Sequence, residues 1–269
     1  MTAAVPTLPA FADVLSAAAR IAPHAQQTPV LRSRSLDDIA GCRLYFKCEN
    51  LQRVGAFKFR GACNAIFALD DATAARGILT QSSGNHGAAV ALASRLRGLS
   101  ATVVVPEGAP AVKLAAITGY GARVVRCAPT MAARNAAAAA LIEETGAHLV
   151  HPFDDAQVIA GQGTVALEFL HSEPGLDALL TPVGGGGLLS GCALTARTLR
   201  PELEILGAEP AGAADAQASL REGRCITDMV ANTICDGLRG QLAPRTLALL
   251  QRHSDGILTV DDDAVIEAM

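Results

Sequence analysis

The sequence contains no tryptophan, and aromatic residues make up only 3% of its 269 residues. Half of the chain is nevertheless apolar, so its core must rest on small and branched aliphatic side chains. This composition excludes a disordered chain and a collagen-like repeat. The length is enough for one large α/β domain or for two modest domains, each with its own core.

The sequence also lacks an excess of either charge. It has 22 basic and 26 acidic residues, which gives a formal net charge of -4. Nucleic acids and anionic membranes are usually bound through strongly basic surfaces, and nothing in this balance predicts one. We therefore expect neither nucleic acid nor membrane as a partner.

Paired cysteines are missing as well, since no two cysteines form a Cys-x-x-Cys motif. The seven cysteines are Cys42, Cys48, Cys63, Cys127, Cys192, Cys225 and Cys235. An odd and scattered set favours free thiols in a reducing compartment over a disulfide or zinc framework. The first 19 residues contain no basic residue, so the charged start of a secretory signal is absent, and we expect a cytoplasmic protein.

One stretch, Ala178–Ala196, has no charged residue and is long enough to span a bilayer, which takes about 20 apolar residues. Pro182 and the glycines from Gly184 to Gly187 interrupt it, and a helix in lipid would lose backbone hydrogen bonds there. We predict a buried strand, a loop and a helix instead.

Short β-branched runs alternate with helical segments along the chain. The predicted strands are Arg43–Cys48, Gly77–Gln81, Ala101–Val105, Arg123–Cys127, Ala147–His151, Ala178–Val183, Glu204–Ala208 and Ile257–Val260. The predicted helices are Arg60–Ala68, Asn85–Arg97, Ala109–Thr118, Thr130–Thr145, Val158–His171, Leu188–Thr198 and Thr246–His253. This alternation predicts an α/β fold with doubly wound parallel sheets, and the number of strands favours two open-sheet domains with a ligand cleft between them.

The first segment with chemical character surrounds Lys58, which stands between Phe57 and Phe59 at a predicted helix start. An apolar flank and a helix N-terminus disfavour the ammonium form, and a free amine is what a nucleophile or base requires. The alternative is a surface lysine that opens an amphipathic helix.

The second segment, Gln81–Gly87, joins a predicted strand to a predicted helix. Its small residues leave backbone N–H groups free for an anion, while Ser83 offers a hydroxyl and Asn85 an amide donor. The alternative is a turn in which Ser82 or Ser83 merely caps the helix, with His86 as a core or cleft histidine.

The third segment contains four consecutive glycines, Gly184–Gly187, again between strand and helix. Glycine costs chain entropy unless the backbone must approach a group closely or adopt positive φ, and a phosphate is the natural partner of such a loop. The dinucleotide motif G-x-G-x-x-G is not met, because Leu189 and Ser190 occupy the positions of its last glycine. A purely structural tight turn is the alternative.

Glu209 and Asp215 follow a predicted strand and are separated by small residues. Two such carboxylates can share a hard cation with a carbonyl oxygen, and the alternative is a pair of solvated loop charges. The three other segments together suit one ligand: a phosphorylated aldehyde cofactor held as a Schiff base by a lysine, beside an amino-acid carboxylate.

In these segments, and in Val158–Thr164, the sequence resembles the fold-type II pyridoxal-phosphate family, specifically its serine/threonine dehydratase and serine racemase branch. The resemblance runs from the N-terminus to about Gly240. It implies a tryptophan synthase β-subunit-like fold with a cofactor cleft between a large domain, residues 1–68 plus 153–269, and a small substrate-side domain, residues 75–152. It also implies a homodimer.

The resemblance assigns roles to the candidate residues. It implies that Lys58 binds pyridoxal 5'-phosphate as a Schiff base, that Asn85 contacts the ring hydroxyl, that Phe57 lines the pocket, and that Gly184, Gly185, Gly186 and Gly187 bind the phosphate. Ser82, Ser83, Gly84, Asn85 and His86 would hold the substrate carboxylate, with Ser83 facing Lys58 across the ring. In the racemase branch, positions matching Glu209, the Ala213 carbonyl and Asp215 bind Mg²⁺ or Ca²⁺.

The implied reaction is β-elimination of L-threonine or L-serine to a 2-oxo acid and ammonia, with small amino acids as the substrates. Serine racemisation and 3-hydroxyaspartate deamination are alternatives, because all three start with loss of the α-proton. Nothing after Gly240 matches the family's Ser-Gly-Gly-Asn-like segment, and the chain ends at Met269 inside a predicted helix, Asp261–Met269. We therefore expect a C-terminally short chain without a regulatory domain, which leaves a catalytically weak cofactor-binding protein as an alternative of another class.

Overall fold

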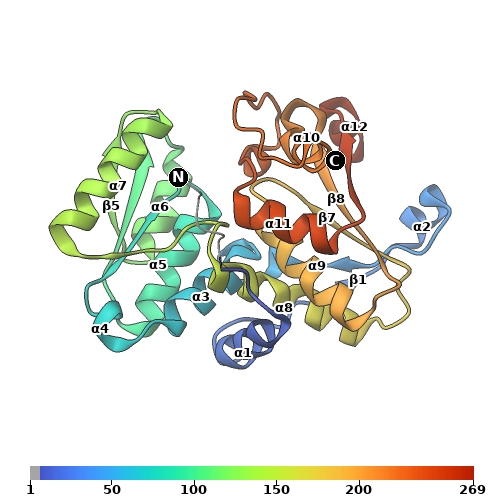
Figure 1. The fold of residues 1–269 in the computed structure, drawn as a ribbon, viewed down its shortest axis with the longest axis horizontal. Coiled ribbons are helices and arrows are strands. Elements are labelled where there is room, and N and C mark those ends of the chain that lie inside the picture. The colour runs from blue at the N-terminus through green and yellow to red at the C-terminus, as the bar shows by residue number, and fades with distance from the viewer. Residues whose placement is uncertain (1–6) are drawn as a thin grey trace.

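The computed structural model describes residues 7–269 and consists of two lobes, one in green and one in orange and red, joined by the helices between them (Figure 1). The α-helices are α1 (Phe11–Ile21), α2 (Arg34–Ala40), α3 (Lys58–Ala68), α4 (Asp71–Ala74), α5 (Asn85–Arg97), α6 (Ala111–Gly119), α7 (Met131–Thr145), α8 (Ala156–Ser172), α9 (Gly187–Leu199), α10 (Asp215–Glu222), α11 (Pro244–His253) and α12 (Asp262–Ala268). Short 3-10 helices are η1 (Glu49–Leu51), η2 (Arg53–Gly55), η3 (Ala211–Ala213) and η4 (Asp236–Leu238).

The strands form three sheets. They are β1 (Val30–Leu31), β2 (Phe46–Lys47), β3 (Ile78–Gln81), β4 (Ala101–Pro106), β5 (Arg123–Cys127), β6 (His148–Leu149), β7 (Ala178–Pro182), β8 (Glu204–Pro210) and β9 (Gly256–Val260). A four-stranded sheet has the order β5-β4-β3-β6, and a three-stranded sheet has the order β7-β8-β9. All pairs in both sheets are parallel, which confirms the predicted α/β architecture.

The N-terminal part differs from the prediction. The strand expected over Arg43–Cys48 is reduced to β2, which pairs antiparallel with β1. Helices α1, α2, α4 and α10 were not predicted. The short helices α2, α4 and α10 have too few turns to show a clear apolar period in the sequence. They depend instead on caps at their ends and on contacts with the rest of the chain.

Buried parallel strands explain the apolar sequence of the four-stranded sheet. Leu79 on β3 and the β4 residues Val103, Val104 and Val105 are fully buried, as expected where both faces of a sheet are covered. Helix α5 is also buried along most of its length, because its alanines and glycine allow close packing on every side. The carboxyl ends of β3 and β7 each lead, through a short loop, to the N-terminus of a buried helix.

Helices α3, α8 and α9 pack closely through glycines in the middle of the molecule. A Cβ on Gly61 of α3 would lie 2.3 Å from Nε2 of Gln162 on α8. A Cβ on Gly191 of α9 would lie 2.4 Å from the carbonyl oxygen of Ile159 on α8. The helix backbones therefore approach one another at distances that no larger residue permits.

Arg60, two residues after Lys58, anchors the start of α3 through buried ion pairs. Its side chain is 0% exposed and forms ion pairs of 2.8 Å with Glu49 and 2.6 Å with Glu168. Lys47 completes the network with a 2.7 Å ion pair to Glu168. A buried guanidinium with both partners in place ties α3 to η1 and to α8.

Within residues 7–269, no helix is long and apolar enough to cross a membrane. The uncharged stretch after Ala178 forms β7, a glycine loop and α9, as the sequence predicts. The four-stranded sheet lies inside residues 75–152, the predicted small domain, and the exact division between the domains stays a prediction.

Candidate active site

Lys58 is the first residue of α3, and its amine is held inside the protein rather than in solvent. Its Nζ donates a hydrogen bond of 2.9 Å to the carbonyl oxygen of Pro152 and lies 5.2 Å from the ring centre of Phe57. Burial lowers the pKa of Lys58 to about 8. Lys58 is therefore not a surface lysine, and roughly a tenth of it is the free amine at pH 7, far more than for a lysine with a pKa of 10.5.

The backbone before Lys58 has an unusual shape. Val54 and Gly55 both have positive φ, at 58° and 70°, and the valine is the only non-glycine residue of this kind among residues 7–269. A β-branched residue in this region is strained, and such strain is concentrated at functional sites. The turn that it makes leads directly into the start of α3.

The Ser82–His86 loop follows β3 and starts α5. Gly84 occupies the N-cap position without a side-chain cap, while the Ser82 hydroxyl accepts from the N–H of Gly84 at 3.3 Å. The alternative of a serine that caps the helix is therefore wrong. Ser83 is half-buried and Asn85 is exposed, so both can reach a ligand.

His86 is 2% exposed and lies beneath this loop. Its Nε2 is 3.2 Å from the carbonyl oxygen of Val150, and its Nδ1 has no partner among residues 7–269. Burial, together with the charge of the nearby Lys58, lowers the pKa of His86 to about 3. The ring is therefore neutral at physiological pH, with its proton on Nε2 facing the carbonyl.

The glycine loop after β7 presents free backbone donors. Among residues 7–269, no acceptor is found for the backbone N–H groups of Gly184, Gly185 and Gly186. Gly186 has φ +80° and forms the N-cap of α9. Free N–H groups at the N-terminus of a buried helix form a site for an anion such as a phosphate.

One short segment, Val150–Asp154, brings the three motifs together. The carbonyl oxygen of Val150 accepts a hydrogen bond from Thr80 Oγ1 at 2.8 Å and faces His86. The carbonyl oxygen of Pro152, two residues later, accepts a hydrogen bond from Lys58. A Cβ on Gly185 would lie 2.4 Å from the ring of Phe153, so this ring packs directly against the glycine loop.

This segment was not among the site residues predicted from the sequence. A signal was present, because it follows the predicted strand Ala147–His151 and so lies at the carboxyl end of a strand, like the other motifs.

Glu209 and Asp215 lie inside the protein, and the alternative of solvated loop charges is therefore wrong. They are 2% and 3% exposed. Glu209 lies near the carboxyl end of β8, and its carboxylate accepts hydrogen bonds from the backbone N–H groups of Ala216 and Gln217 at 3.2 and 2.8 Å. Asp215 starts α10 and accepts from the N–H of Leu242 at 3.1 Å.

These two carboxylates lack a positively charged partner among residues 7–269. Burial raises the pKa of Glu209 to about 7, with a further contribution from Asp215, and burial also raises the pKa of Asp215. Neither forms an ion pair with a basic group of residues 7–269, and no cluster of three His, Cys, Asp or Glu side chains is found in that range. Ala213 lies in η3, between the two carboxylates in the sequence.

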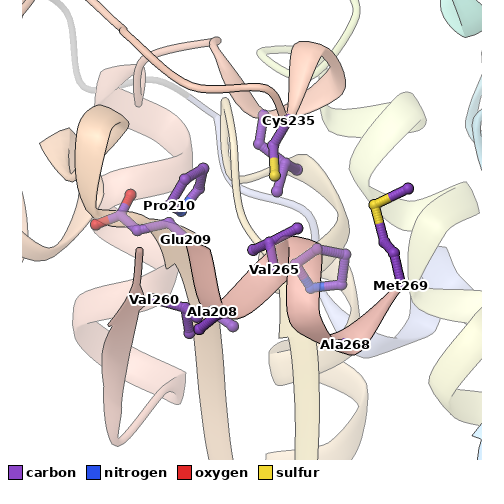
Figure 2. Close-up of a pocket in the computed structure, with 11 residues that line it drawn as sticks. Ala208, Glu209, Pro210, Cys235, Val260, Val265, Ala268 and Met269 are labelled. Atoms are coloured by element: carbon purple, nitrogen blue, oxygen red, sulfur yellow. The ribbon is translucent and has the colours of Figure 1, made fainter. Parts of the chain in front are cut away.

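A cavity of about 340 Å³ lies between the carboxyl ends of the three-stranded sheet and helix α12 (Figure 2). Its walls are mostly apolar, with Ala208, Pro210, Val260, Val265 and Met269 around it. The carboxylate of Glu209 points away from Met269 in this view. The cavity offers few groups for catalysis, so the chemistry belongs to the segments around Lys58.

Comparisons with known proteins agree with this geometry. The family model "Pyridoxal-phosphate dependent enzyme" matches residues 21–269. The chain is 48% identical to a serine racemase of Dictyostelium discoideum, covering 96% of this chain and 80% of that protein. It is 46% identical to the L-threo-3-hydroxyaspartate ammonia-lyase of Saccharomyces cerevisiae, covering 97% and 81%.

A solved structure of maize serine racemase superimposes with a TM-score of 0.96 at 44% identity, covering 98% of this chain and 80% of that one. The chain therefore belongs to the pyridoxal-phosphate dependent enzymes of fold type II. Within them it is similar to serine racemases and to hydroxyaspartate ammonia-lyases. The resemblance noted in the sequence is confirmed.

The residues present fit this cofactor. Lys58 supplies an amine with a lowered pKa for the aldehyde, and the N–H groups of the glycine loop supply donors for the phosphate. Both are joined through Val150–Asp154. Phe57 and Asn85 lie at the N-termini of α3 and α5, helices that pack against each other.

Proposed function

We propose that this protein acts on small L-amino acids with a β-hydroxyl group, removing the α-proton and then either racemising or deaminating the substrate. Serine racemisation and 3-hydroxyaspartate deamination are its main reactions, ahead of threonine or serine dehydration. The observation that carries this proposal is the convergence of Lys58, the Ser82–His86 loop and the glycine loop on Val150–Asp154.

In this proposal Lys58 holds the aldehyde of pyridoxal phosphate and the N–H groups of Gly184–Gly187 hold its phosphate. Asn85 contacts the ring hydroxyl, and Phe57 lines one side of the pocket. When bound, the cofactor delocalises the negative charge left on Cα after the proton is lost.

Once the substrate amine has displaced it from the aldehyde, Lys58 would be a free amine and would act as the base. Its lowered pKa supports this role, because near neutral pH far more of an amine with a pKa of about 8 is in the free, proton-accepting form than of one at 10.5. The N–H groups of the Ser82–His86 loop orient the substrate carboxylate. The hydroxyl of Ser83 delivers a proton to the opposite face of Cα, which gives the D-amino acid. Departure of the β-hydroxyl as water instead leaves an enamine, which water hydrolyses to a 2-oxo acid and ammonia.

The relatives support this order of reactions. Their names include serine racemase and L-threo-3-hydroxyaspartate ammonia-lyase at 46–48% identity over nearly the whole chain. A threonine deaminase structure at 45% identity keeps threonine as a second candidate. The discriminating measurement is therefore the product formed from each substrate.

The test uses purified protein mixed with pyridoxal phosphate. We expect an absorbance band at the edge of the visible range that is lost in Lys58→Ala and kept in the control Lys113→Ala. With L-serine, 3-hydroxyaspartate and L-threonine in turn, D-amino acid and 2-oxo acid are measured. Ser83→Ala should lower racemisation by about 10²-fold or more while elimination persists. A protein that stays colourless with the cofactor would contradict the proposal.

We also propose that Glu209, the Ala213 carbonyl and Asp215 bind Mg²⁺ or Ca²⁺. Cation binding to the folded state raises the melting temperature by mass action. We therefore expect Ca²⁺ to raise it in the wild type and in Glu204→Gln, an exposed residue of the same strand, but not in Glu209→Gln. Equal melting temperatures of the wild type with a chelator and with Ca²⁺ would exclude the site.

A homodimer and a cytoplasmic location complete the proposal. The single, scattered cysteines, all free among residues 7–269, support a reducing compartment. Light scattering of the purified protein distinguishes a dimer of about twice 27.6 kDa from a monomer.

A further inference from the structure

His151 stands at the start of the turn that connects the site. Its Nδ1 accepts from the backbone N–H of Asp154 at 2.8 Å and from that of Phe153 at 3.4 Å. Pro152, between the two ends of these bonds, carries the carbonyl that accepts from Lys58. The shape of the turn, and with it the position of this carbonyl, therefore depends on one imidazole nitrogen.

The same turn also fixes the glycine loop. The rings of His151 and Phe153 meet edge to face, with centres 4.7 Å apart and an interplanar angle of 84°. A Cβ on Gly185 would lie 2.4 Å from the Phe153 ring, and one on Gly187 would lie 2.9 Å from Phe153 Cβ. The lysine and the phosphate loop are far apart in the sequence, and both take their positions from this turn.

We propose that His151 is a positioning residue: its unprotonated Nδ1 holds the turn that sets the Lys58 amine against the glycine loop. Its effect on turnover rests on the proposed function, whereas its effect on Lys58 does not. A nitrogen can accept two N–H groups only while it carries no proton. Protonation would place a third donor against the N–H groups of Phe153 and Asp154 and open the turn.

The charges around His151 decide when this happens. Burial lowers the pKa of His151, which keeps Nδ1 unprotonated near neutral pH. Asp154 in the turn and Asp155 at the start of α8 oppose this effect, while Lys58 on α3 and Arg245 on α11 reinforce it. His86 on α5 also faces the ring but is neutral above a pH of about 3, so it adds no charge near neutral pH. The turn is therefore intact near neutral pH and opens as the pH falls through the lowered pKa.

Two variants separate the acceptor from the bulk of the side chain. In His151→Asn, the amide oxygen is bonded to Cγ, as Nδ1 is in histidine, and accepts without titrating in this range. In His151→Leu, a side chain of comparable size has no acceptor. Both are compared with the wild type, first without cofactor, so that the readout does not depend on catalysis.

The first readout is hydrogen exchange at the amides of Phe153 and Asp154, with the intrinsic pH dependence removed. We expect at least tenfold faster exchange in His151→Leu and wild-type exchange in His151→Asn at pH 7.5. Acidification should speed exchange in the wild type but not in His151→Asn. The second readout is competitive acetylation of Lys58, which should show its pKa rising toward 10.5 in His151→Leu only, because the amine moves into solvent.

With cofactor and substrate, kcat should fall at least tenfold in His151→Leu and be restored in His151→Asn. In His151→Asn, the decrease in kcat at acid pH that comes from opening of the turn should be absent. Wild-type exchange and Lys58 reactivity in a folded His151→Leu would overturn the proposal. If that variant does not fold, identical acid-side exchange profiles of the wild type and His151→Asn would overturn it. A protein that shows these effects on Lys58 but turns over no amino acid would contradict the proposed function alone.

Discussion

At the scale of single residues, burial decides the chemistry of the site. Lys58 is an ordinary lysine by composition, and its amine becomes reactive because the protein surrounds it and leaves only the carbonyl of Pro152 as a partner. His86 is distant from Lys58 in the sequence but near it in space, and burial keeps its ring neutral as well. Removal from water therefore disfavours the charged form of both bases.

This burial predicts a pH-dependent penalty on stability. The pKa of Lys58 is about 8 in the folded protein and 10.5 as its ordinary value, so between these values only the unfolded state binds the proton. The contribution of Lys58 to stability therefore rises as the pH rises from 8 to 10.5, and below pH 8 the full penalty is present.

We therefore expect Lys58→Met, without cofactor, to be more stable than the wild type by about 2 kcal/mol at pH 7, with the difference fading toward pH 10.5. Urea denaturation at both pH values measures this, and Lys113→Met, at a partly exposed lysine, is the control. A constant difference across this range would show that the lysine is not the titrating group.

At the scale of secondary-structure elements, glycines let α3, α8 and α9 approach closely enough to support the site. Gly61 and Gly191 stand where a Cβ would meet Gln162 and the backbone of Ile159. The buried ion pairs of Arg60 also tie α3 to η1 and to α8. The N-terminus of α3, which carries Lys58, is therefore placed by helix packing rather than by its own loop.

Gly191→Ala tests this packing. The new Cβ would lie 2.4 Å from the Ile159 carbonyl oxygen and 2.6 Å from the Gly163 nitrogen, and both are backbone atoms that cannot rotate away. We expect Gly191→Ala to lower the free energy of unfolding by about 1–3 kcal/mol. Alanine gains about 1 kcal/mol over glycine in helix propensity, but the cost of the clash exceeds this gain.

The matched control is Gly175→Ala, because a Cβ there would meet no atom within 4 Å. It should change stability by no more than about 0.5 kcal/mol in the same urea titration. Equal stability of the two variants would contradict the close approach of α8 and α9.

At the scale of the whole molecule, the two lobes contact each other across an ion pair. Lys113 on α6, in the lobe with the four-stranded sheet, pairs with Asp236 in η4 of the other lobe. Asp236 is mostly exposed, and the pairing lowers its pKa. Exposed pairs contribute about 0–1 kcal/mol, so this contact biases the spacing of the lobes without locking it.

Reversing one charge should separate the lobes. We expect Asp236→Lys to increase the radius of gyration in small-angle scattering at low salt, and high salt to reduce the difference because it screens the repulsion. The double variant with Lys113→Asp should restore the wild-type value. An unchanged radius in Asp236→Lys at low salt would mean that other contacts set the spacing.

The sequence by itself determined the motifs and most of the parallel strands and longer helices. Helix α5 and strand β5 begin and end at the predicted residues, and Lys58, Ser83 and the glycine loop all lie at junctions before a helix, as predicted. These features are encoded locally, because strand alternation, helix periodicity and glycine content act within a few residues along the chain.

Only the tertiary structure decided which groups meet and how they titrate. The contacts of the His151 turn with Lys58 and with the glycine loop, and the burial of Glu209 and Asp215, depend on residues far away in the sequence. Lys58 and the Pro152 carbonyl are separated by 94 residues, yet their contact places the amine. Desolvation is set by everything that surrounds a group in space, so no local pattern specifies it.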